Sequence, residues 1–107
     1  MLKKHPCVIH AVNLCEAYYD LVRRSRPESA DRIEHVIRAL GLGLRSGMAS
    51  SLWRRAGRLK ADLRRLSLAD CFALALTQEL GGVLVTADHH EFDPIAKAGL
   101  CPIHFIR

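Results

Sequence analysis

Three acidic residues in this 107-residue chain share one kind of position, just after an apolar run or in the first turn of an expected helix: Glu16, Asp70 and Asp88. Taken singly, Glu16 and Asp70 suit a structural role, because an acid three residues after an N-cap stabilises the helix start. Taken together, three carboxylates at one end of a parallel sheet would repel each other unless a cation lay between them. Carboxylate oxygens without a His or Cys ligand set suit Mg²⁺ or Mn²⁺. This favours a metal site that hydrolyses phosphodiesters.

Two polar residues beside these acids are candidate supporting groups. Asn13 is expected to be the N-cap of the helix that carries Glu16, in capping-box relation to it. Thr86 ends a short strand two residues before Asp88. Its hydroxyl could hydrogen-bond a carboxylate or a water. Alternatively, Thr86 is simply a strand residue of high β-propensity.

The residues that follow Asp88 have less specific interpretations. His89 and His90 are adjacent histidines in what reads as an exposed polar turn, although assistance to Asp88 stays open. Asp93, directly before Pro94, is more typical of a turn residue than of a metal ligand.

The stretch Leu66–Asp93 must position two of the acids. Ser67 followed by Asp70 has the form of a capping box and predicts the start of a largely buried helix. The glycine pair that begins at Gly81 ends this helix, because glycine tolerates the left-handed C-cap conformation. Val83–Thr86 is then an apolar run typical of a buried strand.

The other expected elements alternate in type along the chain. The first is a buried strand over Cys7–Val12, which is followed by a helix. Next come a helix from Pro27 to Leu40, with Ile33, Val36, Ile37 and Leu40 inward, and a brief strand over Leu42–Leu44. A helix from Ser46 to Ala61, with Leu52, Ala56 and Leu59 inward, and a last strand over Ile103–Ile106 complete the set. Strands separated by helices predict a parallel α/β sheet with right-handed crossovers. We expect a single domain over residues 1–107.

A group of basic residues on the third expected helix suggests a polyanionic partner. Arg54, Arg55 and Arg58 are candidates for contact with an RNA backbone, because Lys and Arg neutralise phosphates by displacing counterions. A solvated helix face is an equally good interpretation. The formal net charge of +5 and the pI near 9.4 agree with an anionic partner but do not require one.

Composition places the chain among ordinary globular proteins. Hydrophobic residues make up 50% and charged residues 25%, and no apolar run approaches membrane-spanning length. The four cysteines are far apart, lack paired C-x-x-C spacing and mostly lie in apolar runs: Cys7, Cys15, Cys71 and Cys101. They are interpreted as reduced, buried thiols of a cytoplasmic protein rather than as disulfides or a zinc site.

Two segments and the closing strand resemble the PIN domain of bacterial toxin–antitoxin systems, a VapC-like ribonuclease. The segments are AVNLCEAYYDLVRR (Ala11–Arg24) and LSLADCFALALTQELGGVLVTADHHEFDPI (Leu66–Ile95), and the matched set comprises Asn13, Glu16, Asp70, Thr86 and Asp88. The resemblance implies a PIN-like parallel sheet flanked by helices. It also implies an endoribonuclease dependent on Mg²⁺ or Mn²⁺, with the three acids as catalytic metal ligands. A homodimer and a cognate antitoxin that blocks the site are further implications.

One departure from the family pattern concerns the N-terminus. Members of the family begin with a buried strand ending in an aspartate, whereas only Met1–Pro6 precedes the strand Cys7–Val12 here. The chain is therefore expected to be N-terminally truncated, either as a piece of a longer product or as a naturally shortened descendant. Without that strand, Cys7–Val12 and Val83–Thr86 have open edges. Three outcomes are possible: the two strands pair with each other, a second copy of the chain supplies a strand, or the chain stays loosely packed and aggregates. Pairing with a second copy is favoured.

Two other functions fit the same residues. A catalytically inactive PIN-like module that binds RNA or an antitoxin would keep the fold without the chemistry. An acid-lined phosphatase or other metal hydrolase of doubly wound fold would turn over small phosphate esters and leave RNA intact.

Overall fold

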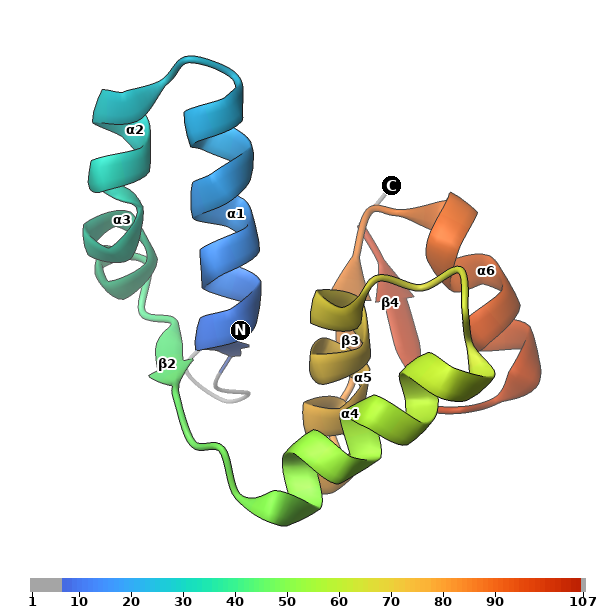
Figure 1. Cartoon of the computed structure of the whole chain (residues 1–107). Coiled ribbons are helices and arrows are strands. Elements are labelled where there is room, and N and C mark those ends of the chain that lie inside the picture. The colour runs from blue at the N-terminus through green and yellow to red at the C-terminus, as the bar shows by residue number, and fades with distance from the viewer. Residues whose placement is uncertain (1–6, 107) are drawn as a thin grey trace. The chain divides into compact units, whose positions relative to one another are not determined.

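A computed structural model describes residues 7–106 of the chain, which divides into two compact units, Met1–Gly47 and Met48–Arg107 (Figure 1). Each unit is described by itself. Six helices and short parallel strands among the described residues confirm the predicted α/β class. Met1–Pro6, on which the expectation of a missing strand rests, lies outside the described range.

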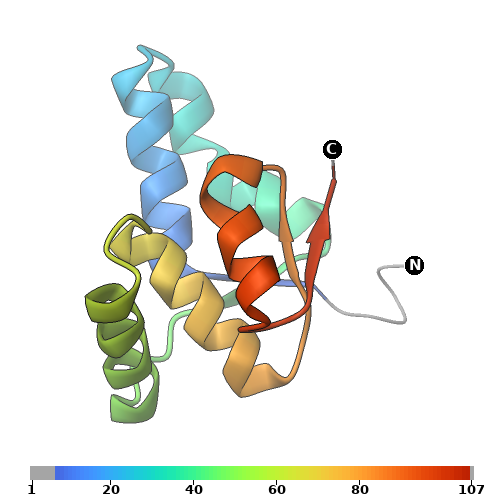
Figure 2. The same cartoon turned by 90° about the vertical axis from the view of Figure 1, so that its right-hand side faces the viewer.

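The second unit contains three helices and one pair of strands. Its elements are α4 (Ser50–Asp62), α5 (Leu68–Leu80), β3 (Leu84–Thr86), α6 (His89–Ala98) and β4 (Ile103–Phe105). Strands β3 and β4 are parallel and in register, with Leu84 opposite Ile103 and Thr86 opposite Phe105, and α6 connects them (Figure 2). This confirms the two strands predicted near the end of the chain and their parallel arrangement.

Most of the hydrophobic core of the described residues lies in the second unit, where α4 packs against α5. The predicted inward residues Leu52 and Ala56 are buried on α4, and Cys71, Phe72, Leu74 and Ala75 are buried on α5. Burial raises the pKa of the Cys71 thiol, so this cysteine is an inert core residue. The expectation that the four cysteines are buried is confirmed for Cys71 only, because Cys15 is exposed and Cys7 and Cys101 are half-buried.

Helix α6 was not predicted from the sequence. The prediction of a polar turn at His89 and His90, with Asp93 as a turn residue, is wrong because all three lie in the helix. Phe92 and Ile95 explain its formation, since they are three residues apart and only 3% and 4% exposed. Pro94 lies inside the helix, where proline normally signals a break.

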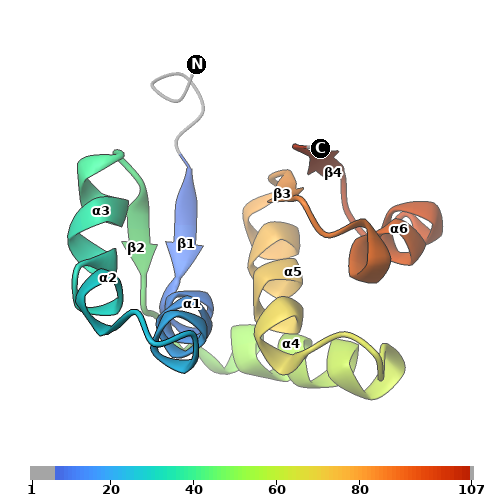
Figure 3. The same cartoon turned by 90° about the horizontal axis from the view of Figure 1, so that it is seen from above.

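The first unit contains three helices and a second pair of strands. Its elements are β1 (Val8–His10), α1 (Ala11–Arg23), α2 (Pro27–Asp31), α3 (Ile33–Ala39) and β2 (Gly43–Arg45). Strands β1 and β2 are parallel, as Figure 3 shows, with Val8 opposite Gly43. A Cβ atom at Gly43 would lie 3.3 Å from Cγ1 of Val8, so the close approach of the strands suits glycine there. Within residues 7–106, β1 pairs only with β2, and β3 only with β4.

The start of α1 differs from the prediction. The strand is shorter than Cys7–Val12, and the N-cap is His10 rather than Asn13. The backbone N–H of Val12 donates to Nδ1 of His10 at 3.1 Å, and Nε2 of His10 lies 2.9 Å from the carbonyl oxygen of Gly47. His10 is 2% exposed, so both ring nitrogens have backbone partners in a buried environment.

The helix predicted from Pro27 to Leu40 is interrupted at Arg32, so α2 and α3 are separate. Its predicted inward face is wrong in part, because Val36 and Leu40 are 44% and 61% exposed. Among the described residues of this unit, only Ala30 and His10 are buried. The unit therefore has little hydrophobic core against which a longer amphipathic helix could pack. No helix within residues 7–106 is long and apolar enough to cross a membrane.

Candidate functional site

Asp70 lies in the first turn of α5, as predicted from its capping-box spacing. The backbone N–H of Asp70 donates to Oγ of Ser67 at 3.1 Å, and Gly81 ends the helix in the left-handed region at φ 63°. Asp70 is half-buried. Asp70 therefore lies near the positive end of the α5 dipole.

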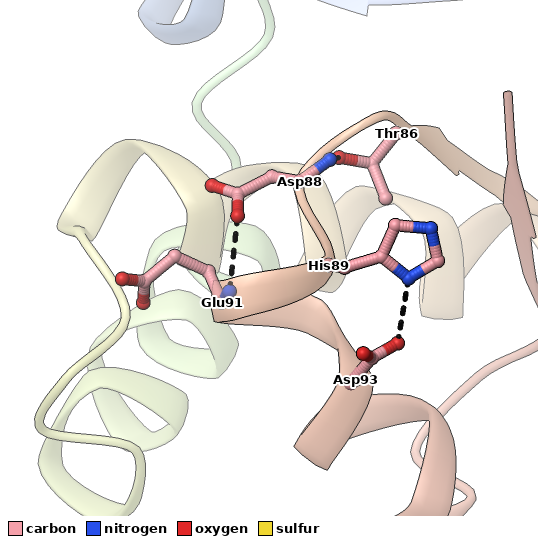
Figure 4. A network of polar contacts seen from close by, with 5 residues as sticks. All are labelled: Thr86, Asp88, His89, Glu91 and Asp93. Carbon is pink, nitrogen blue, oxygen red and sulfur yellow. Dashed lines mark hydrogen bonds and ion pairs between the residues drawn. The ribbon is translucent and has the colours of Figure 1, made fainter. Parts of the chain in front are cut away.

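Asp88 is the N-cap of α6 (Figure 4). Its Oδ1 accepts the backbone N–H of Glu91 at 3.0 Å, and its own backbone N–H donates to Oγ1 of Thr86 at 3.0 Å. Thr86 therefore fixes the turn that leads into the cap. Asp88 is exposed, and a carboxylate that accepts one backbone N–H retains lone pairs for a cation.

His89 is held in a defined orientation beside Asp88. Its Nδ1 lies 3.0 Å from Oδ1 of Asp93, one helical turn further along α6 (Figure 4). The imidazole also stacks on Phe105 of β4, with ring centroids 4.1 Å apart. These contacts connect α6 to the last strand, which gives His89 and Asp93 a structural role.

Glu16 lies in the second turn of α1, and the first turn of that helix contains no acid. The capping role considered for Glu16 is therefore wrong. Among residues 7–106, no hydrogen bond or ion pair to the exposed Glu16 carboxylate is present. Asp20, one turn later, differs, because a hydrogen bond from Arg23 lowers the pKa of Asp20 and the charge of Arg24 acts in the same direction.

The three candidate RNA-binding arginines are exposed on α4 but are not equivalent. Nη1 of Arg55 donates to Oε1 of Gln78 on α5 at 3.2 Å, so part of this guanidinium stabilises the helix pair. Cζ of Arg54 lies 5.2 Å from the ring centroid of Trp53. Arg58 lies one turn after Arg54, so these two side chains share a face of the helix.

Comparison with protein families matches residues 2–98 of the chain to the PIN domain. The chain belongs to the PIN domain family. Comparison with curated proteins and with solved structures found no significant match. PIN domains have nuclease-type functions, bind RNA and generally use divalent metals. These three properties agree with the nuclease, RNA and metal expected from the sequence.

The acids of this PIN domain are distributed over both units. Asp70 and Asp88 belong to the second unit and Glu16 to the first. In the part of the chain that the structure describes, no group of three or more His, Cys, Asp or Glu side chains is placed to hold a metal ion. The convergence of all three acids therefore stays a prediction.

The donor chemistry of the second unit fits a divalent cation of the magnesium type. Mg²⁺ keeps several waters and commonly uses one or two protein carboxylates together with substrate phosphates. Asp70 and Asp88 are two carboxylates, each at the N-terminal start of a helix, and their joint binding of one cation stays a prediction. Sequence reasoning found both acids, but it missed the capping bond that orients Asp88.

Proposed function

We propose that this PIN domain is a metal-dependent endoribonuclease of the VapC-like type that hydrolyses RNA phosphodiester bonds. The observation that carries the proposal is the placement of Asp70 and Asp88 at the starts of α5 and α6 in a chain of this family. Ser67, and not Asp70, is the N-cap of α5.

The cation in this proposal is Mg²⁺ or Mn²⁺, held by Asp70 and Asp88, with Glu16 as a third ligand on the resemblance to VapC-like ribonucleases. When bound, such an ion would supply a Lewis acid for the phosphate and a more acidic water. Asp88 contributes a carboxylate whose orientation is fixed by the Glu91 N–H. Thr86 supports Asp88 through the turn, whereas Asn13, inside α1 at its third position, is a candidate supporting residue for Glu16.

The RNA backbone in this proposal is held by the arginines of α4. Arg54 and Arg58 are exposed, and Arg55 keeps donors beyond the one that Gln78 uses. Neutralising phosphates with these side chains would release counterions and bring the phosphodiester toward the acids. We extend the proposal to a cytoplasmic toxin that forms a homodimer and is inhibited by a cognate antitoxin, on the resemblance alone.

The test is cleavage of a single-stranded RNA with Mn²⁺ or Mg²⁺ present. We expect wild type to cleave, EDTA to stop cleavage, and Asp70→Asn to lose at least about 100-fold in rate. Asn keeps the size of the side chain and the backbone N–H that donates to Ser67, and a melting temperature equal to that of wild type would exclude loss of folding as the cause.

The matched control is Glu79→Gln, which removes an exposed carboxylate nine residues further along the same helix, about 13 Å along its axis. This variant should cleave like wild type. Cleavage by Asp70→Asn at the wild-type rate would remove Asp70 from the site. RNA binding without any metal-dependent cleavage would instead support the inactive PIN-like module.

A further inference from the structure

The chain has a single tryptophan, Trp53, and it is not part of the core. Trp53 is 47% exposed on α4, whereas Leu52 and Ala56 on the same helix are buried against α5. The guanidinium of Arg54 lies over its ring, with Cζ 5.2 Å from the centroid. The indole is therefore held by a cation–π contact while nearly half of the residue stays accessible.

A glycine one turn further along the helix keeps the surface beside the indole open. Gly57 lies inside α4 and is exposed, and a Cβ atom at this position would meet nothing within 4 Å. Packing therefore does not require glycine, although glycine inside a helix is unfavourable relative to alanine. Residues four apart share a helix face, and a side chain at position 57 would lean back toward Trp53.

The segment that carries this surface is strongly basic. Between Ser50 and Arg65 there is a single acid, Asp62, against six basic residues: Arg54, Arg55, Arg58, Lys60, Arg64 and Arg65. The ammonium of Lys60 donates to the backbone carbonyls of Arg64 and Leu66, both at 2.8 Å, and so stabilises the loop after α4. Arg54, whose guanidinium lies over the indole, and Arg58, one turn after Arg54, are both exposed. We call Trp53, Arg54, Gly57 and Arg58 the Trp53 surface.

We propose that the Trp53 surface binds single-stranded RNA, with an unpaired base stacked on the indole and the neighbouring phosphates bound by Arg54 and Arg58. Every base has a π-face, so stacking tolerates any sequence, but a paired base in an A-form helix cannot present that face to a side chain. This inference rests on the proposed RNA binding and adds a base-stacking position at Trp53 to the arginines of α4.

Because Trp53 is the only tryptophan, its fluorescence reports directly on the surface. The probes are a short oligoadenylate and the same strand annealed to oligouridylate, each titrated in EDTA so that no cleavage occurs. We expect the single strand to quench the emission as it binds, and the duplex to bind at least about 10-fold more weakly. Trp53→Ala should weaken single-strand binding roughly 10-fold or more, and Trp53→Phe should restore most of it.

Tyr19 provides a matched control, because it is 60% exposed on α1 with Cζ of Arg23 at 6.0 Å from its ring centroid. Tyr19→Ala should leave RNA affinity unchanged. Gly57→Leu should weaken binding while the melting temperature is maintained or rises, since leucine is the better helix former. Replacing Arg54 and Arg58 with Gln should flatten the salt dependence of single-strand binding by about 0.7 per lost phosphate contact.

Three results would overturn the inference: RNA binding without a change in emission, equal affinity for single strand and duplex, or unchanged affinity in Trp53→Ala. Quenching by poly-glutamate as strong as that by oligoadenylate would also overturn it and would assign the surface to an acidic protein partner. These results are independent of catalysis, because a chain that binds and quenches in EDTA but never cleaves contradicts only the proposed nuclease activity.

Discussion

Asp88 has an observed structural role and a proposed catalytic one, and two substitutions separate them. Asp88→Ala removes both the cap of α6 and the charge, whereas Asp88→Asn keeps a side-chain oxygen that can accept the Glu91 N–H. Loss of an N-cap costs about 1 kcal/mol, and Asn is about as good a cap as Asp. For a chain of 107 residues, 1 kcal/mol corresponds to a decrease in melting temperature of roughly 4–8 °C. We therefore expect that decrease for Asp88→Ala and a change of only a degree or two for Asp88→Asn.

The metal distinguishes the two roles of this carboxylate. Mn²⁺ that binds only the folded chain should stabilise the wild type by mass action, and its melting temperature should therefore rise. At an Mn²⁺ concentration of 100 times the dissociation constant, the free energy of unfolding should increase by about 2.7 kcal/mol. Asp88→Asn should lose most of this Mn²⁺-dependent increase and most of the RNA cleavage while remaining folded. Asp93→Asn is the control, because Asp93 is on the same helix and contacts His89 instead. A wild-type response to Mn²⁺ in Asp88→Asn would show that Asp88 is a cap and nothing more.

Three further substitutions or modifications test the structure of each unit. His10→Ala should lower the free energy of unfolding by about 2 kcal/mol in urea titration, because both ring nitrogens have backbone partners. His90→Ala is the control and should change this free energy by less than about 0.5 kcal/mol, because the His90 side chain is 90% exposed. Alkylation followed by mass spectrometry should modify the exposed Cys15 well before the buried Cys71, whose pKa is raised by burial. Gly81→Ala should reduce stability by about 1 kcal/mol in the same titration, because the residue adopts φ 63°.

Local signals in the sequence were sufficient for α5 but not for α6. Ser67 and Gly81 mark the ends of α5 because a capping side chain and a left-handed glycine act within a few residues. Helix α6 has the same kind of start at Asp88, but its polar residues and Pro94 concealed it. Burial of Phe92 in the core, which is a tertiary effect, decided the conformation.

The start of α1 could not be predicted from the sequence for a related reason. Asn13 is the better N-cap by local preference, yet the cap is His10. That choice depends on the carbonyl of Gly47, which lies 37 residues away in the sequence and holds the imidazole in place. No local pattern encodes such a contact.

For the candidate site, local patterns predicted Asp70 in the first turn of α5 and Asp88 directly after a strand, but not the cap that Asp88 forms on α6. The approach of Glu16 to them is a long-range property that no local pattern encodes. Trp53 was missed because the arginines around it were interpreted by charge alone. A signal for it was available in the sequence. Trp53 directly follows Leu52, so it cannot lie on the inward face of the helix that was predicted from Leu52, and it is exposed.

The central claim is that Glu16, Asp70 and Asp88 bind one divalent cation, and paramagnetic broadening by Mn²⁺ tests it most directly. In a ¹H–¹⁵N NMR spectrum of the whole chain, sub-stoichiometric Mn²⁺ should broaden the backbone amides of all three residues first. The amide of Glu79, at the far end of α5 from Asp70, serves as the internal reference and should broaden later. Broadening at Asp70 and Asp88 with a sharp Glu16 signal, or uniform broadening across the spectrum, would contradict the shared metal site.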